Sequence, residues 1–213
     1  MNFLTEQAFE FSRTGVFSYS DVLVWLGENR NSVKGLVRRA IASGEIVHVR
    51  RGLYCLSRKY NRYGINRLVL ANLVYGPSYV SMESALAFHG WIPEAVHAVT
   101  SVSLGRARSF ETPLGHFDYG QVRQFPLLAA VERVREEDGA QSFLVARPLK
   151  AIADYVASHG RDWTGPEPLE ESLRIDRESL ETLASDDFEE LDGVYRSRRA
   201  RRFLDGLRRS LGR

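Results

Sequence analysis

Residues 30–43 read RNSVKGLVRRAIAS, and their apolar side chains recur at the spacing of one helical face. That face consists of Val33, Leu36, Val37, Ala40 and Ile41. The periodicity predicts a helix packed on a core. A helical wheel places polar, basic and small residues on the opposite side: Asn31, Gly35, Arg38 and Ala42, flanked by Ser32, Lys34 and Arg39. A helix with this outward face fits the major groove of duplex DNA, which is about 12 Å wide.

The segment before this helix carries the signals of another helix start. Ser18 can cap a helix, Asp21 completes a capping box three residues later, and Phe17 can pack on Val22. Gly27 suits the left-handed position just past the end of that helix. The two helices predict a helix-turn-helix whose turn passes through residues 28–29.

Two short β-rich runs follow at residues 46–49 and 53–56, around Arg50-Arg51-Gly52. They predict a hairpin, and a hairpin in this place is a wing whose tip arginines can reach a phosphate or the minor groove. We therefore expect residues 1–58 to be a winged helix-turn-helix that binds double-stranded DNA. The expected contacts are Arg30, Asn31, Ser32, Lys34, Arg38, Arg39, Arg50 and Arg51. The alternatives are a helical subdomain with a solvated basic face and a winged helix that contacts proteins.

The rest of the chain predicts a mixed α+β domain over residues 61–160 and a helical segment over 169–213 that packs on it. Helices are expected near 65–74, 82–88 and 149–157, and strands near 96–102, 114–119, 121–125 and 142–146. Gly and Pro at residues 165–168 indicate a linker before the final helices. The expected fold class is α+β, with an N-terminal winged helix-turn-helix, a mixed α+β domain and a helical C-terminal end.

The sequence shows no constellation of catalytic or metal-binding residues. No glycine precedes Ser or Lys, which excludes a P-loop. The five histidines are dispersed without a His-x-x-x-His pair, and the acidic clusters at 136–138 and 186–187 lie in a turn and a helix start. Lys150 and Asp154 read as an exposed ion pair worth about 0.3–0.5 kcal/mol, with a catalytic pair as the alternative. We expect no enzyme, metal or cofactor.

Charge is distributed unevenly. Residues 1–60 hold nine Lys and Arg against five acids, a net of +4; residues 162–192 hold two against twelve, a net of −10; and residues 193–213 hold eight against one, a net of +7. The final arginines either pair with the acidic segment or form a second surface for DNA or a protein partner: Arg198, Arg199, Arg201 and Arg202. A single cysteine, no secretory signal and no apolar run of about 18–20 residues predict a cytoplasmic protein.

Three segments resemble the AbiEi-type antitoxins, the regulator partners of type IV toxin–antitoxin (abortive infection) systems. They are VRRGLY at 49–54, YVSMESALAFHG at 79–90 and ARPLKAIAD at 146–154. The resemblance covers about residues 14–160 and is most specific in the second segment. Five positions match the family pattern and are expected to serve packing: Ser84, His89, Gly90, Lys150 and Asp154.

The resemblance implies a winged helix that represses its operon through inverted repeats, and a C-terminal domain that counteracts a nucleotidyltransferase toxin. One departure from the family is the compact helical end after residue 160. The expectation is a DNA-binding repressor that is also a type IV antitoxin. The alternative is a transcription factor of a defence or mobile-element operon whose C-terminal domain senses a ligand or dimerises.

Overall fold

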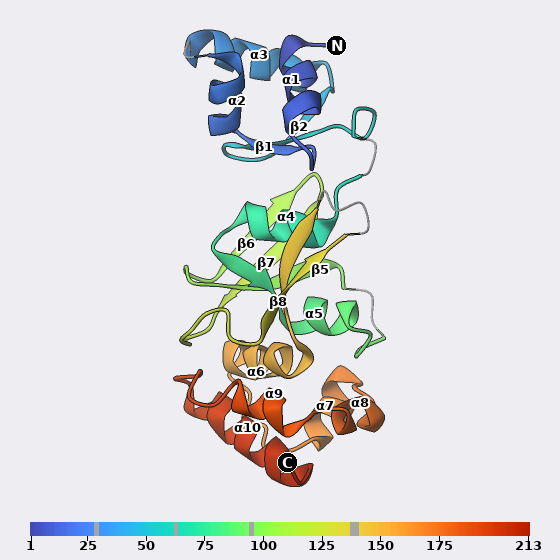
Figure 1. Cartoon of the computed structure of the whole chain (residues 1–213), viewed down its shortest axis with the longest axis vertical. Helices are drawn as coiled ribbons and strands as arrows, with labels where there is room; N and C mark the ends of the chain where they lie inside the picture. Colours follow the sequence, from blue (N-terminus) through green and yellow to red (C-terminus); the bar gives the residue numbers. More distant parts are fainter. Residues whose placement is uncertain (28–29, 62–63, 94–95, 137–140) are drawn as a thin grey trace.

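The computed structural model of the chain describes residues 1–27, 30–61, 64–93, 96–136 and 141–213. Its elements are stacked along one long axis (Figure 1). The N-terminal helices lie at one end, a six-stranded sheet lies in the middle, and the C-terminal helices lie at the other end. The expected α+β class is confirmed.

The N-terminal region combines three helices with a small antiparallel sheet of order β1-β3-β2. Its elements are α1 (Phe3–Phe11), β1 (Val16–Ser18), α2 (Tyr19–Leu26), α3 (Arg30–Ala42), β2 (Ile46–Arg50) and β3 (Leu53–Leu56). The start of α2 agrees with its prediction, because Ser18 and Asp21 form a capping box. Gly27 follows the helix with a positive φ of 69°, but its ψ of 160° lies outside the left-handed helical region that was expected there. Helix α1 and strand β1 are not predicted by the sequence pattern.

The small sheet is buried on both faces. Tyr54 and Leu56 of β3 belong to a core shared with α1, α2 and α3, whereas Leu53 and Cys55 belong to the core of the middle region. Successive strand residues point to opposite faces, so one strand serves both cores. The helices therefore cover one side of this sheet and the middle region covers the other (Figure 1).

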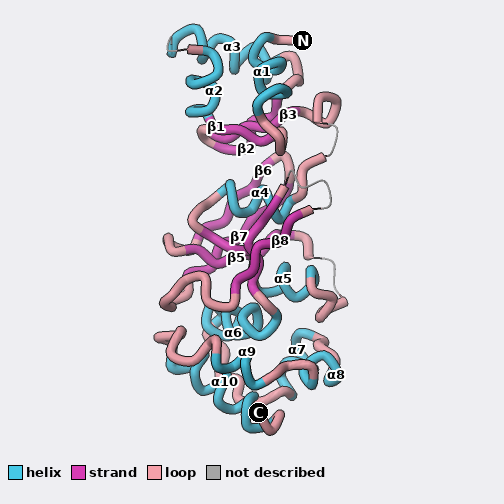
Figure 2. The backbone as a smooth tube through the Cα atoms, viewed as in Figure 1, coloured by secondary structure: helices cyan, strands magenta, loops and turns pink. Residues whose placement is uncertain are grey.

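The middle region is a mixed six-stranded sheet of order β6-β7-β5-β4-β9-β8. Helix α4 lies on the face toward the N-terminal region, and α5 and α6 lie on the opposite face (Figure 2). The elements are α4 (Arg67–Val74), β4 (Ser78–Val80), α5 (Met82–Phe88), β5 (Ala98–Ser103), β6 (Arg108–Thr112), β7 (Gly115–Gln121), β8 (Val131–Arg135), β9 (Ser142–Ala146) and α6 (Pro148–His159).

The strand expected at 121–125 is wrong. Residue Gln121 ends β7, and beyond it the chain forms a single antiparallel bridge between Gln124 and Tyr195. Strands β4, β6 and β8 are not predicted by the sequence pattern, because β4 is only three residues long and β6 and β8 occupy the two edges of the sheet.

The C-terminal helices form a layer against α6. They are α7 (Glu167–Leu173), α8 (Arg177–Glu181), α9 (Ser185–Glu189) and α10 (Arg198–Ser210). Phe203 and Leu207 of α10 are buried in the same core as Val156 of α6. Gly206 permits a close approach, since a Cβ atom there would lie 1.9 Å from the carbonyl oxygen of Thr164. Across the described residues, no helix combines the length and apolar character needed to cross a membrane.

Candidate nucleic-acid interface

Helix α3 presents a basic face to solvent. Val33, Val37 and Ala40 are buried, whereas Ser32, Lys34, Arg38 and Arg39 are exposed. Within the described residues, the three cationic side chains form no ion pair. The side chains of Arg30 and Asn31, which begin the helix, lie outside what the structure describes. The exposed cations are therefore available to an external anion.

A groove of about 420 Å³ runs beside this face. Lys34 and Arg38 line it together with the apolar side chains of Val37 and Ile41, and two tyrosines from outside α3 complete the lining: Tyr19 and Tyr54. The groove therefore joins α3 to the start of α2 and to the small sheet. Cations beside an apolar floor match the phosphates and sugars of a nucleic-acid strand.

Gly35 lies in the middle of α3. Among the described side chains, a Cβ atom at this position would meet the Arg39 guanidinium, at 3.4 Å. Glycine inside a helix costs about 1 kcal/mol relative to alanine. Because Gly35 has no side chain, a ligand could approach the backbone of α3 closely at this position once the Arg39 side chain moved aside.

The N-terminus of the chain holds the far end of α3 in place. The backbone N–H of Asn2 donates to the Glu45 carboxylate at 2.7 Å, and the Asn2 amide donates to the Leu36 carbonyl at 3.4 Å. The hydrogen bond from the Asn2 backbone, aided by the charge of the N-terminal amine, lowers the pKa of Glu45 below its ordinary value of 4.5. The ionised carboxylate therefore links α1 to the turn that follows α3.

This link predicts a pH dependence. A carboxyl whose pKa is lowered by folding stabilises the folded state above its unfolded pKa, and this contribution is lost as the pH falls through the folded pKa. We expect the stability that Glu45 supplies to be complete at pH 6 and to decline below pH 4.5. Urea denaturation of Glu45→Gln and of the native chain, at pH 6 and at a pH well below 4.5, measures this contribution to stability. The difference between the two proteins should shrink at low pH, and a difference independent of pH contradicts the assignment.

The two arginines expected at the wing tip occupy different environments. Arg51 is exposed in the turn between β2 and β3. Arg50 instead ends β2, is half-buried, and lies 5.9 Å from the Phe110 ring of β6, with its Nε atom buried and without a hydrogen-bond partner in the described structure. The expectation that Arg50 sits at the tip is therefore corrected, because its guanidinium packs at the junction with the middle region.

The arginines of α10 lie at the end of the molecule opposite α3 (Figure 1). Arg199 pairs with Asp162 at 3.0 Å, and Arg208 pairs with Glu189 and Asp192 at 3.7 and 3.6 Å. These contacts join the basic helix to the acidic segment. The remaining members of the expected second surface are exposed and have no ion pair within the described residues: Arg198, Arg201 and Arg202.

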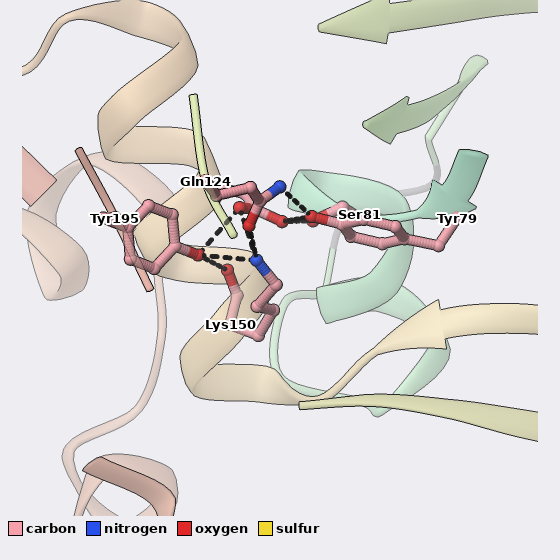
Figure 3. Close-up of polar contacts among 6 residues, drawn as sticks. Tyr79, Ser81, Gln124, Lys150 and Tyr195 are labelled. Atoms are coloured by element: carbon pink, nitrogen blue, oxygen red, sulfur yellow. Dashed lines mark hydrogen bonds and ion pairs between the residues drawn. The ribbon is translucent and has the colours of Figure 1, made fainter. Parts of the chain in front are cut away.

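A buried polar cluster connects the middle region to the C-terminal layer (Figure 3). Lys150 and Asp154 are both 0% exposed, and Lys150 Nζ lies 3.2 Å from Asp154 Oδ1. Lys150 also donates to the side chains of Gln124 and Tyr195. The expectation of an exposed ion pair is wrong, because the helix face that carries both residues is covered by β4 and by the segment around Tyr195.

Asp154 is the main acceptor of this cluster. Tyr79, Ser81 and Tyr195 each donate a hydroxyl hydrogen bond to its carboxylate at 2.7 Å. Burial raises the pKa of Tyr79 and of Tyr195 well above the ordinary value, and burial lowers the pKa of Lys150. The three hydroxyls therefore remain donors, and the cluster joins β4, α6 and the segment before α10.

The sequence pattern misses this cluster because its members are far apart in the chain. Only the spacing of four between Lys150 and Asp154 is visible without coordinates, and that spacing alone does not reveal burial. The structure encloses both charged side chains, and their contacts join residues that are far apart in the chain. In the described part of the chain, no three His, Cys, Asp or Glu residues are grouped so as to hold a metal ion.

Comparisons with known proteins do not assign the chain to a family. No protein-family model matches it, and no curated protein is significantly similar to it in sequence.

Proposed function

We propose that residues 1–58 form a winged helix-turn-helix that binds duplex DNA, and that the protein is a transcriptional repressor. The observation that carries the proposal is the basic face of α3. Its cations Lys34, Arg38 and Arg39 are exposed and lack intramolecular anionic partners in the described residues. Phosphate contacts from such side chains supply most of the affinity of DNA-binding proteins.

The order of elements supports this proposal. Three helices followed by a hairpin, with a short strand between α1 and α2 that pairs with β3, is the arrangement of winged helix-turn-helix domains. Helix α3 then takes the place of the recognition helix, and Arg51 lies in the hairpin turn. The middle region covers the far face of the small sheet, so the module presents its helices outward.

Selection of duplexes from a random 25-base-pair library tests the proposal, followed by fluorescence anisotropy of the selected duplex over a range of salt. We expect enrichment of an inverted repeat and a log–log salt slope that grows by roughly 0.9 for each phosphate contact. A matched control is the Arg38→Ala/Arg51→Ala variant, which should enrich no sequence. If the native chain binds no duplex even at low salt, the proposal is wrong.

Gly35→Ala separates stability from binding. The alanine removes the conformational cost of glycine, and we expect the free energy of unfolding to rise by about 0.5–1 kcal/mol. The added methyl group lies on the proposed DNA-facing side of α3, and we expect affinity for the selected duplex to fall. Urea denaturation and anisotropy measure the two effects. If the affinity of Gly35→Ala for the selected duplex is unchanged, the DNA does not contact this side of α3.

We also propose, from the resemblance to AbiEi-type antitoxins, that the protein counteracts a nucleotidyltransferase toxin. The shared residues are largely those that build the middle region. Tyr79, Ser81, Lys150 and Asp154 lie in the buried cluster, and His89 Nε2 lies 2.9 Å from the Ala146 carbonyl. They support a shared architecture of residues 64–160 and assign no chemistry to it.

Growth assays test the antitoxin role. The gene next to that of the protein is expressed alone and then together with the full chain. Arrest followed by rescue supports the role, and rescue by the Arg38→Ala/Arg51→Ala variant would show that neutralisation does not need operator binding. Absence of arrest, or arrest without rescue, favours the alternative of a transcription factor with a ligand-sensing or dimerising domain.

A further inference from the structure

The segment after β7 and the segment before α10 form a short two-stranded ribbon. Phe125 donates its backbone N–H to the Val194 carbonyl at 2.9 Å, and Arg196 donates to the Arg123 carbonyl at 3.0 Å, on either side of the bridge between Gln124 and Tyr195. In this antiparallel register Arg123 lies directly opposite Arg196. Side chains alternate between the two faces of such a ribbon.

The inner face of the ribbon closes the buried cluster. The side chain of Gln124 accepts a hydrogen bond from Lys150 and donates one to Tyr79 at 2.6 Å, and Tyr195 donates to Asp154 (Figure 3). The alternation then places Arg123, Phe125 and Arg196 on the outer face. All three line a groove of about 790 Å³ between the sheet, α6 and the start of α10.

The groove combines unpaired like charges with exposed apolar side chains, which is unfavourable for a surface that binds nothing. Like charges directly opposite each other on paired strands destabilise the pair. Arg123 and Arg196 are both exposed, and the described residues offer neither of them an ion-pair partner. The rim also exposes two large apolar side chains, Phe125 at 76% and Leu104 at 59%.

We propose that this groove binds a mononucleotide, a phosphate monoester that carries a planar base. Two guanidinium groups match the double negative charge and the several acceptor oxygens of such a phosphate, whereas a carboxylate needs only one. The exposed Phe125 ring offers a stacking surface for the base. The groove volume lies within the range of about 300–1,000 Å³ found for small-molecule sites.

The start of α10 adds to the positive potential of the groove. Ser197 caps this 13-residue helix and lines the groove beside Arg196, so the positive end of the helix dipole faces the same space. A ligand here would contact the end of β7, α6 and the N-cap residue of α10 together. It would therefore rest on the outer side of the ribbon whose inner side closes the cluster of Lys150 and Asp154.

Isothermal titration calorimetry of the full chain tests the proposal with adenosine monophosphate and guanosine monophosphate as probes. Adenosine and ribose 5-phosphate serve as partial ligands that lack the phosphate or the base. We expect at least one mononucleotide to bind, adenosine not to bind, and ribose 5-phosphate to bind more weakly. No binding of either mononucleotide at millimolar concentration would overturn the proposal.

Variants locate the binding. Arg123→Gln/Arg196→Gln should weaken mononucleotide binding by about tenfold or more, the loss expected from removing charge-assisted hydrogen bonds. Phe125→Ala should weaken the mononucleotide and leave ribose 5-phosphate unchanged. The matched control is Arg201→Gln/Arg202→Gln on the outer face of α10, which should bind normally. The proposal is overturned if both double variants lose mononucleotide affinity equally. It is also overturned if Arg123→Gln/Arg196→Gln loses affinity for duplex DNA but keeps its affinity for the mononucleotide.

Discussion

Replacement of Asp154 by leucine alone will lower the free energy of unfolding by about 3–5 kcal/mol, the cost of leaving a buried charge without its partner. The cost is large because the Asp154 carboxylate has several buried partners. Asp154 pairs with Lys150 and also accepts hydroxyl hydrogen bonds from Tyr79, Ser81 and Tyr195. Removal of this carboxylate leaves the Lys150 cation without its counter-ion and three hydroxyl groups without their acceptor, in a site that solvent does not reach.

The matching variant Lys150→Met should lower the free energy of unfolding by less than Asp154→Leu does. Asp154 keeps its three hydroxyl donors after that change, and Gln124 keeps its hydrogen bond to Tyr79. The double variant Lys150→Met/Asp154→Leu should cost less than the sum of the single changes, because neither charge is left alone. Urea denaturation followed by circular dichroism measures all three.

An exposed ion pair provides the control for this series. Arg199 and Asp162 lie 3.0 Å apart with more than half of each side chain exposed, and breaking such a pair changes stability by about 0–1 kcal/mol. Arg199→Ala should therefore have little effect. If Lys150→Met costs as much as Asp154→Leu, the carboxylate is not the centre of the cluster.

The same cluster shows what a linear pattern omits. A spacing of four places Lys150 and Asp154 on one helical face but gives no sign of what covers that face. The cover comes from Tyr79, 75 residues before Asp154, and from Tyr195, 41 residues after it. Burial of a charged pair depends on long-range packing, whereas periodicity reports only the near neighbours of each residue along the chain.

Local signals were sufficient where structure is local. The capping box of Ser18 and Asp21, and the burial of Val33, Val37 and Ala40 in α3, follow from residues within a few positions of one another. Ile41 was expected on the same buried stripe, but its side chain is 38% exposed. Arg50 differs because its position depends on the neighbouring sheet. The hairpin itself is a local feature, but the aromatic ring of Phe110 that receives its guanidinium is brought there by the packing of the two regions.

The second large effect concerns DNA. Arg38→Ala should weaken binding to the selected duplex by about 1–3 kcal/mol, roughly five- to 150-fold in Kd, and should reduce the preference for it over random DNA. Arg38 is exposed on α3 and lines the groove beside that helix. In the proposed binding mode, α3 lies in the major groove and Arg38 would contact a base edge. Anisotropy titrations with both duplexes measure the two losses.

Arg51→Ala supplies the contrast, because this residue is exposed in the hairpin turn and is expected to contact phosphate. Its loss should weaken binding to every duplex alike and reduce the salt slope by about one. Arg201→Ala, at the end of the molecule opposite α3, should change neither quantity. If Arg38→Ala instead weakens all duplexes equally, α3 contacts the backbone alone, and the sequence is read by another part of the chain.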